Sequence, residues 1–112
     1  MSKQTKSLQW RNKYEFKSAV AQLAIEMKIK KLGTIYVRPM TRKWASITSD
    51  GRILNFNTEL LEMDKQIGKY VIVHELTHLR VQNHGKLFKA IMKSYMPNYL
   101  EVEKRFNLGC QS

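Results

Sequence analysis

Cysteine and long apolar runs are nearly absent from this chain of 112 residues. Its one cysteine, Cys110, excludes an internal disulfide and a metal site built from several thiolates, and it predicts a reducing compartment. No segment approaches the roughly 18 apolar residues of a membrane-spanning helix, and residues 1–9 are basic and polar with no apolar stretch behind them. We therefore expect a cytoplasmic protein.

Glycine, proline and acidic residues are also scarce, at 5 Gly, 2 Pro and 9 Asp and Glu. With 43% hydrophobic residues the chain is neither fibrous nor disordered, and we expect one domain, residues 1–112, with loose ends at about 1–10 and 107–112. The few acidic residues face 20 Lys and Arg, so the formal net charge is +11. This charge suits anionic partners such as nucleic acid, although a solvated, solubility-giving surface explains it equally well. We expect a monomer.

The first and last parts of the chain show helical spacing of apolar residues. An amphipathic helix is predicted within residues 14–29, with Gly33 as its cap or as a turn residue. Further helices are predicted after Gly85, ending at Pro97, and within residues 99–106. The positions expected to pack are Phe16, Val20, Leu23 and Met27 in the first helix, Leu87, Phe88, Ile91, Met92 and Tyr95 in the second, and Leu100 and Phe106 in the last.

Three short β-branched and aromatic runs lie between these helices, at residues 34–38, 44–48 and 52–56. Between the second and third runs, Asp50-Gly51 predicts a two-residue type I′ hairpin turn, which needs positive φ at both positions. We expect a small sheet of about three strands, mostly antiparallel, with an edge free to accept another strand.

All histidines of the protein lie close together, at His74, His78 and His84. Positions i and i+4 share one face of a helix, so His74 and His78 can present two imidazole nitrogens to an ion about 2.0–2.1 Å away. Glu75 lies about 100° around the helix from His74 and can reach a water activated by the ion without being a ligand. We expect the helix to end near Asn83 and the chain to turn back at Gly85, so that His84 supplies a third protein ligand. This leaves one position open, as in catalytic zinc sites.

These histidines can form a metal site or be ordinary half-buried polar residues, and their clustering favours the metal site. Ordinary half-buried histidines are the alternative, but a chance His-Glu-x-x-His in a chain of this composition has a probability of about half a per cent. The preceding run, residues 67–73, predicts a strand by propensity alone, whereas the motif requires a helix. A helix that is apolar nearly all round is buried, so we expect the central helix of the domain here, with a dry shell around the metal site. The shell residues are Val71, Ile72, Val73, Leu76 and Leu79.

At these residues the sequence resembles the minimal zincin metallopeptidases of the YgjP-like, WLM and SprT-like kind. The resemblance is carried by residues 74–80, 83–88 and 96–99. Upstream, residues 44–47 and 51–55 are similar to the segment that precedes the metal helix in YgjP-like members. That segment usually reads Trp-Gly-Ser-Cys, and this chain departs from it at Ala45 and Ile47.

The resemblance implies a small α+β zincin-like domain with an N-terminal helix, a short sheet, a central metal-binding helix and C-terminal helices. It further implies Zn²⁺ bound by His74, His78 and His84, with Glu75 as the catalytic residue. Peptide bonds would then be hydrolysed by a metal-activated water with Glu75 as general base. An extended peptide substrate can add to the sheet edge near residues 44–48.

Some partners and roles stay open at this point. Tyr95 and Tyr99 are candidates to stabilise the oxyanion, although packing explains them better. The His-x3-His-x5-His spacing also occurs in YbeY-like single-strand endoribonucleases, but Glu75 argues against that alternative. A third alternative is a basic nucleic-acid-binding module with a structural metal, which the open coordination position disfavours. Because SprT-like relatives act on DNA-attached proteins, nucleic acid can tether the enzyme through an N-terminal basic run, with stacking on Trp10 and Tyr14. The run comprises Lys3, Lys6, Arg11, Lys13 and Lys17.

Overall fold

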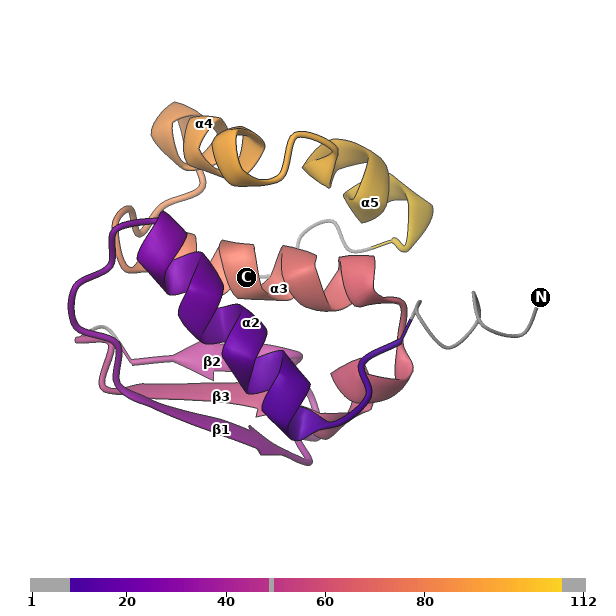
Figure 1. Cartoon of the computed structure of the whole chain (residues 1–112). Helices are drawn as coiled ribbons and strands as arrows, with labels where there is room; N and C mark the ends of the chain where they lie inside the picture. Colours follow the sequence, from indigo (N-terminus) through magenta and orange to yellow (C-terminus); the bar gives the residue numbers. More distant parts are fainter. Residues whose placement is uncertain (1–8, 49, 108–112) are drawn as a thin grey trace.

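The computed structural model describes residues 9–48 and 50–107 of the chain. It is an α+β fold, as expected, and a sheet, a middle layer of two helices and an outer pair of helices follow one another in Figure 1. No helix in the described ranges is long and apolar enough to cross a membrane. The elements are α2 (Lys13–Glu26), β1 (Thr34–Arg38), β2 (Ala45–Ile47), β3 (Ile53–Asn57), the 3-10 helix η1 (Thr58–Glu62), α3 (Lys65–His78), α4 (Lys86–Tyr95) and α5 (Tyr99–Arg105).

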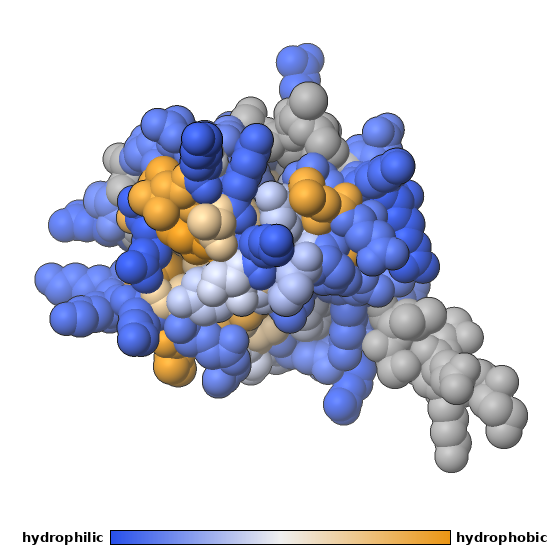
Figure 2. All heavy atoms as spheres, turned by 90° about the horizontal axis from the view of Figure 1, so that it is seen from above, coloured by the Kyte–Doolittle hydropathy of each residue, from blue (hydrophilic) through white to orange (hydrophobic). Residues whose placement is uncertain are grey.

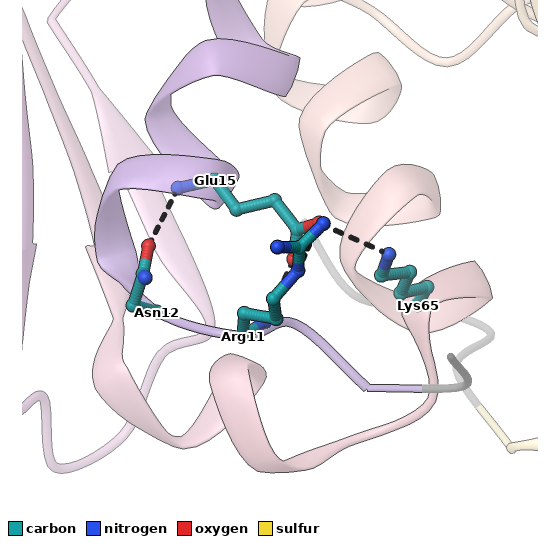
Figure 3. Close-up of polar contacts among 4 residues, drawn as sticks. All are labelled: Arg11, Asn12, Glu15 and Lys65. Atoms are coloured by element: carbon teal, nitrogen blue, oxygen red, sulfur yellow. Dashed lines mark hydrogen bonds and ion pairs between the residues drawn. The ribbon is translucent and has the colours of Figure 1, made fainter. Parts of the chain in front are cut away.

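Helix α2 begins at an asparagine cap. The side-chain oxygen of Asn12 accepts a hydrogen bond from the backbone N–H of Glu15 at 2.9 Å, which satisfies one of the free donors of the first turn (Figure 3). The apolar face predicted for this helix is confirmed, since its members are buried against α3 and the sheet. These residues are Phe16, Val20, Leu23 and Met27.

The end of α2 differs from the prediction. The helix ends at Glu26, and Lys28 takes the left-handed conformation, with φ of 60°, where a glycine is usual. Gly33 is not the cap: a Cβ at this position would lie 2.0 Å from the carbonyl oxygen of Arg52. Glycine is therefore required at position 33 because two backbone segments approach each other closely there. The sequence around Gly33 does not distinguish this role from that of a helix cap.

The sheet has the expected number of strands but is mixed rather than mostly antiparallel. Its order is β1-β3-β2, with β1 parallel and β2 antiparallel to β3. The chain reverses between β1 and β2 and again between β2 and β3, so β1 and β3 run in the same direction. Because β3 lies between the other two strands, that parallel pair becomes adjacent.

The β2–β3 hairpin is confirmed, but its turn is longer than predicted. The N–H of Thr48 donates to the carbonyl oxygen of Ile53 at 3.1 Å, and Gly51 has a positive φ of 74°. The carboxylate of Asp50 accepts hydrogen bonds from the Thr48 hydroxyl at 2.7 Å and from the Arg52 N–H at 3.0 Å. These side-chain bonds shape the loop in place of a tight type I′ turn.

Helix α3 is the centre of the molecule, as predicted. It contacts α2, α4, α5, η1 and β2, so the β-branched run that favours a strand is helical here because burial on all sides outweighs propensity. Of the expected shell, only Leu79 is half-buried and the other members are buried. The buried members are Val71, Ile72, Val73 and Leu76.

Helices α4 and α5 cover α3 on the side away from the sheet (Figure 1). Phe88 and Met92 are buried as predicted, but Leu87 and Leu100 are each 61% exposed and do not belong to the core. In α5 the buried positions are Tyr99 and Val102, because the helix begins at Tyr99 and turns Leu100 outward. Seen from above, this face is mostly hydrophilic with separate apolar areas (Figure 2).

The described part of the N-terminal segment is attached to the domain. Gln9 pairs with Asp64 in an isolated β-bridge, and the Trp10 ring packs edge-on against Phe16 at 4.9 Å. The expected loose end therefore does not extend to residues 9 and 10, and Trp10 packs inward instead of being free to stack on bases. Lys3, Lys6 and Cys110 lie outside the described residues.

Candidate metal centre and catalytic cleft

The last turns of α3 carry two of the three predicted ligands. His74 is buried and His78 is half-buried, and their ring centroids lie 4.9 Å apart. The spacing of four residues places both imidazoles on the same side of the helix, as predicted.

The third histidine reaches the same place from outside the helix. Helix α3 ends at His78, earlier than the predicted end near Asn83, and His84 lies in the segment that leads to α4. The N–H of Gly85 donates to the Asn83 side-chain oxygen at 3.1 Å, and Gly85 has an ordinary φ of −78° as the N-cap of α4. The return of the chain therefore comes from the early helix end and does not require the conformational freedom of Gly85.

The three histidines converge into one cluster. One ring nitrogen from each of His74, His78 and His84 lies within 4.8 Å of the others. Nitrogens around a tetrahedral ion would be about 3.4 Å apart at the usual Zn–N distance, which is near the spacing of the three histidine nitrogens. The donor set thus fits a divalent ion that prefers imidazole.

Phe88 of α4 packs against all three imidazoles. Its ring centroid lies 5.2 Å from that of His74, 4.8 Å from His78 and 4.6 Å from His84. The sequence predicted Phe88 only as a core residue of α4. Phe88 follows His84 by four residues, in the first turn of α4, and this nearness in sequence is the signal that could have indicated the contact.

Tyr70 supports His74 from the other side. The two rings stack at 5.8 Å, and the Tyr70 hydroxyl donates a hydrogen bond to the Glu103 carboxylate at 2.5 Å. Burial, together with this carboxylate, raises the pKa of Tyr70, so the phenol keeps its proton and remains a donor. Helix α5, which carries Glu103, is thereby linked to the histidine cluster.

Glu75 faces a cleft between α3 and β2. Its side chain is mostly buried, and one carboxylate oxygen lies 3.4 Å from Nδ1 of His74. The cleft has a volume of about 280 Å³, and neither Tyr95 nor Tyr99 lines it. Tyr99 is buried in the core, and the lining of the cleft gives no support to either tyrosine as the oxyanion stabiliser. The lining residues are Lys43, Ala45, Ser46, Ile47, Thr48, Glu75, His78 and Gln82.

Comparison with known proteins identifies the family. The family model of the YgjP-like metallopeptidase domain matches residues 3–108 of this chain. The chain belongs to the YgjP-like metallopeptidase family. An uncharacterised protein of Methanocaldococcus jannaschii is 31% identical over 87 residues, covering 75% of this chain and 79% of that protein.

Solved structures agree with this assignment. The crystal structure of the metallopeptidase zymogen jannalysin of Methanocaldococcus jannaschii is similar with a TM-score of 0.71 and 27% identity, over 83% of this chain and 96% of that one. The zymogen of abylysin of Pyrococcus abyssi shares the fold, with a TM-score of 0.72 and 16% identity, over 85% and 94% of the two chains. The YgjP-like domain is thus a metallopeptidase with a minimal zincin-like fold.

The YgjP-like domain favours the neutral form of His78. Burial lowers the pKa of His78, and a positive charge on His74 would lower it further. Because only the unprotonated nitrogen can bind a metal ion, this shift extends the ligand-competent state of His78 to more acidic pH.

The β2 strand presents an open backbone edge to the cleft of the YgjP-like domain. Trp44 and Thr48 form hydrogen bonds with β3, through Asn57 N–H at 2.8 Å and Ile53 C=O at 3.1 Å. In an antiparallel pair, the intervening Ala45 and Ile47 direct their N–H and C=O groups away from β3. Within the described ranges no strand pairs with this edge. It is the edge that the sequence predicted to accept another strand.

Proposed function

We propose that this YgjP-like domain is a zinc-dependent metallopeptidase in which His74, His78 and His84 bind the ion and Glu75 is the general base. The observation that carries the proposal is the convergence of three imidazole nitrogens within 4.8 Å beside a largely buried carboxylate at a cleft. When bound, a zinc ion supplies Lewis-acid polarisation of the scissile carbonyl and activation of a water. Three imidazole nitrogen donors suit zinc better than they suit hard cations, which prefer oxygen ligands.

Glu75 moves the proton in this proposal. Its carboxylate lines the cleft next to His78, so it can accept a proton from a water held there. The same carboxyl group then returns that proton to the leaving amine nitrogen as the peptide bond breaks. The neighbouring His74 keeps Glu75 oriented, with 3.4 Å between His74 Nδ1 and the carboxylate oxygen.

The open edge of β2 orients the substrate. An extended peptide lying antiparallel to β2 would form backbone hydrogen bonds with Ala45 and Ile47, across the cleft from Glu75. Backbone pairing gives affinity with little sequence preference. The substrate class proposed is therefore a protein or peptide segment that can adopt an extended conformation, bound by a monomeric enzyme.

The decisive experiment compares the parent with Glu75→Gln. The variant keeps the size of the side chain but loses the proton acceptor, so zinc content and melting temperature should be close to those of the parent. Peptide hydrolysis should fall by about two orders of magnitude or more. Both proteins are assayed with a quenched fluorescent peptide and with single-stranded RNA. Undiminished proteolysis in the variant would contradict the general-base role, and RNA cleavage in both without proteolysis in either would favour the YbeY-like alternative.

A further inference from the structure

A second cavity lies beyond the end of α3 and contains no residue of the catalytic cleft. It has a volume of about 280 Å³, is open to solvent, and is bordered by the segment after α2, by the β2–β3 connection at Asp50 and by the chain just past His78. In Figure 1 these three segments meet at the end of the molecule opposite α5. The lining residues are Lys28, Ile29, Lys30, Lys31, Asp50, Leu79 and Arg80.

The charge of this cavity is strongly unbalanced. Four cationic side chains face one carboxylate, that of Asp50. Asp50 is already engaged, because it lies 3.6 Å from Nε of Arg52 and accepts hydrogen bonds from Thr48 and Arg52. Within residues 9–48 and 50–107, none of the four lining cations forms an ion pair with a carboxylate. A concave site lined by one sign of charge concentrates the field and attracts anions.

Lys28 stands at a position where stability alone favours glycine. Its N–H donates to the carbonyl oxygen of Ile25 at 3.0 Å, and the N–H of Ile29 donates to that of Ala24 at 2.9 Å. This is the Schellman arrangement, whose left-handed residue is usually glycine because a Cβ is disfavoured there. With φ of 60°, Lys28 keeps a cation at the cavity wall at the expense of backbone strain.

Arg80 is anchored with most of its donors still available. Its Nη1 donates to the backbone carbonyl oxygen of Met27, the residue before Lys28, at 2.7 Å. In the described part of the chain this is the one hydrogen bond of the guanidinium, which has five N–H donors in a fixed fork. The anchored fork is pre-organised for a planar or tetrahedral oxyanion.

We propose that this cavity binds a phosphate group. Lysine ammonium groups on residues 28–31 and the Arg80 fork approach from different elements, which suits the several acceptor oxygens and the higher charge of phosphate better than a single carboxylate. The phosphate can come from free phosphate or from the backbone of a nucleic acid. The proposal does not depend on the peptidase activity of the domain.

The test titrates inorganic phosphate into the full chain and follows the backbone amide signals of residues 28–31 by NMR. A fluorescent single-stranded oligonucleotide is titrated in parallel and read by anisotropy. Lys28→Gly should weaken phosphate binding about tenfold, the effect of losing one charged hydrogen bond. The same variant should melt at a higher temperature without phosphate, because glycine relieves the left-handed strain.

Two further variants complete the design. Arg80→Gln should also weaken phosphate binding, whereas Lys104→Gln on α5 removes the same charge at the far end of the molecule and should leave it unchanged. Saturable binding that depends on Lys28 supports the proposal, and the oligonucleotide arm then tells whether free phosphate or a phosphodiester binds more tightly. Equal binding by the parent, Lys28→Gly and Lys104→Gln overturns it. The proposal is also overturned if a poly-glutamate peptide binds in a way that depends on Lys28 while phosphate does not bind.

Discussion

His84 is the exposed member of the histidine cluster, and this difference from the buried His74 has a consequence for metal affinity. His74 and His78 are held by a helix, but His84 depends on the short segment after α3 and on its contact with Phe88. An ion bound by two histidines alone would lack the third ligand of a catalytic site.

We expect His84→Ala to lose zinc affinity by more than the about 10- to 100-fold that removal of a supporting residue costs. Competition with a fluorescent chelator measures this, and Phe88→Leu is the matched comparison because it leaves every ligand in place. The loss of zinc affinity in Phe88→Leu should stay within this range of about 10- to 100-fold. Full occupancy of His84→Ala under the same chelator would mean that the third ligand lies elsewhere.

At the scale of elements, Glu15 ties the start of α2 to the start of α3 (Figure 3). Its carboxylate accepts hydrogen bonds from the Arg11 N–H at 2.7 Å and from Lys65 Nζ at 3.3 Å. The hydrogen bond from Arg11 is the main cause that lowers the pKa of Glu15 below its ordinary value of 4.5, and Lys65 adds to it. Because the folded-state pKa is the lower one, this stabilisation is present above about pH 4.5 and is lost as pH falls through the folded-state pKa.

Glu15→Gln should therefore lower the free energy of unfolding at pH 7, and the difference from the parent should shrink as the pH falls below 4.5. Urea unfolding across this pH range measures both effects. Glu26→Gln, at the other end of α2, makes the same change of charge without these contacts and serves as control. If the free energy of unfolding of Glu15→Gln stays below that of the parent by the same amount down to pH 3, the charge of the carboxylate contributes nothing to stability.

The edge of β2 gives a prediction about substrate binding. Ala45→Pro removes the one N–H that Ala45 directs away from β3 and leaves the β2–β3 hydrogen bonds intact, since proline is tolerated at the first residue of an edge strand. The KM for an unstructured peptide should rise about fivefold to tenfold, the loss of one hydrogen bond, with kcat changing less. Ala45→Ser keeps the N–H and should behave like the parent. An unchanged KM in Ala45→Pro would rule out strand pairing at this edge.

Local patterns predicted the elements well, and their arrangement less well. The i, i+4 spacing of His74 and His78 and the apolar face of α2 follow from helix geometry, which is a property of neighbouring residues. The strand order β1-β3-β2 depends on which strands pack under α2 and α3, so no local pattern determines it. The support that Phe88 gives to the histidines is likewise invisible until the chain between α3 and α4 turns back.

At the scale of the whole molecule, part of the basic excess behind the net charge of +11 gathers at the two ends of α2. Arg11 and Lys13 lie at its start beside Tyr14, which is 67% exposed, and the lysines of residues 28–31 lie beyond its end. A helix of 14 residues is about 21 Å long, so the two basic regions contact different parts of any bound polyanion. Deleting the N-terminal basic segment up to and including Trp10 would disturb the core, because Trp10 packs against Phe16. Such a deletion could not isolate the contribution of the basic residues to nucleic-acid binding.

Single substitutions separate these regions. If a single-stranded oligonucleotide binds at the start of α2, Lys13→Gln should weaken it and reduce the slope of log affinity against log salt by about 0.7, the value for one phosphate contact. Anisotropy titrations at several salt concentrations measure the slope for the parent, Lys13→Gln, Lys28→Gly and Lys104→Gln. A change confined to Lys28→Gly would move the nucleic-acid contact to the other end of α2. An affinity independent of salt in all four proteins would exclude both regions, because phosphate contacts release counterions and their contribution must weaken as salt rises.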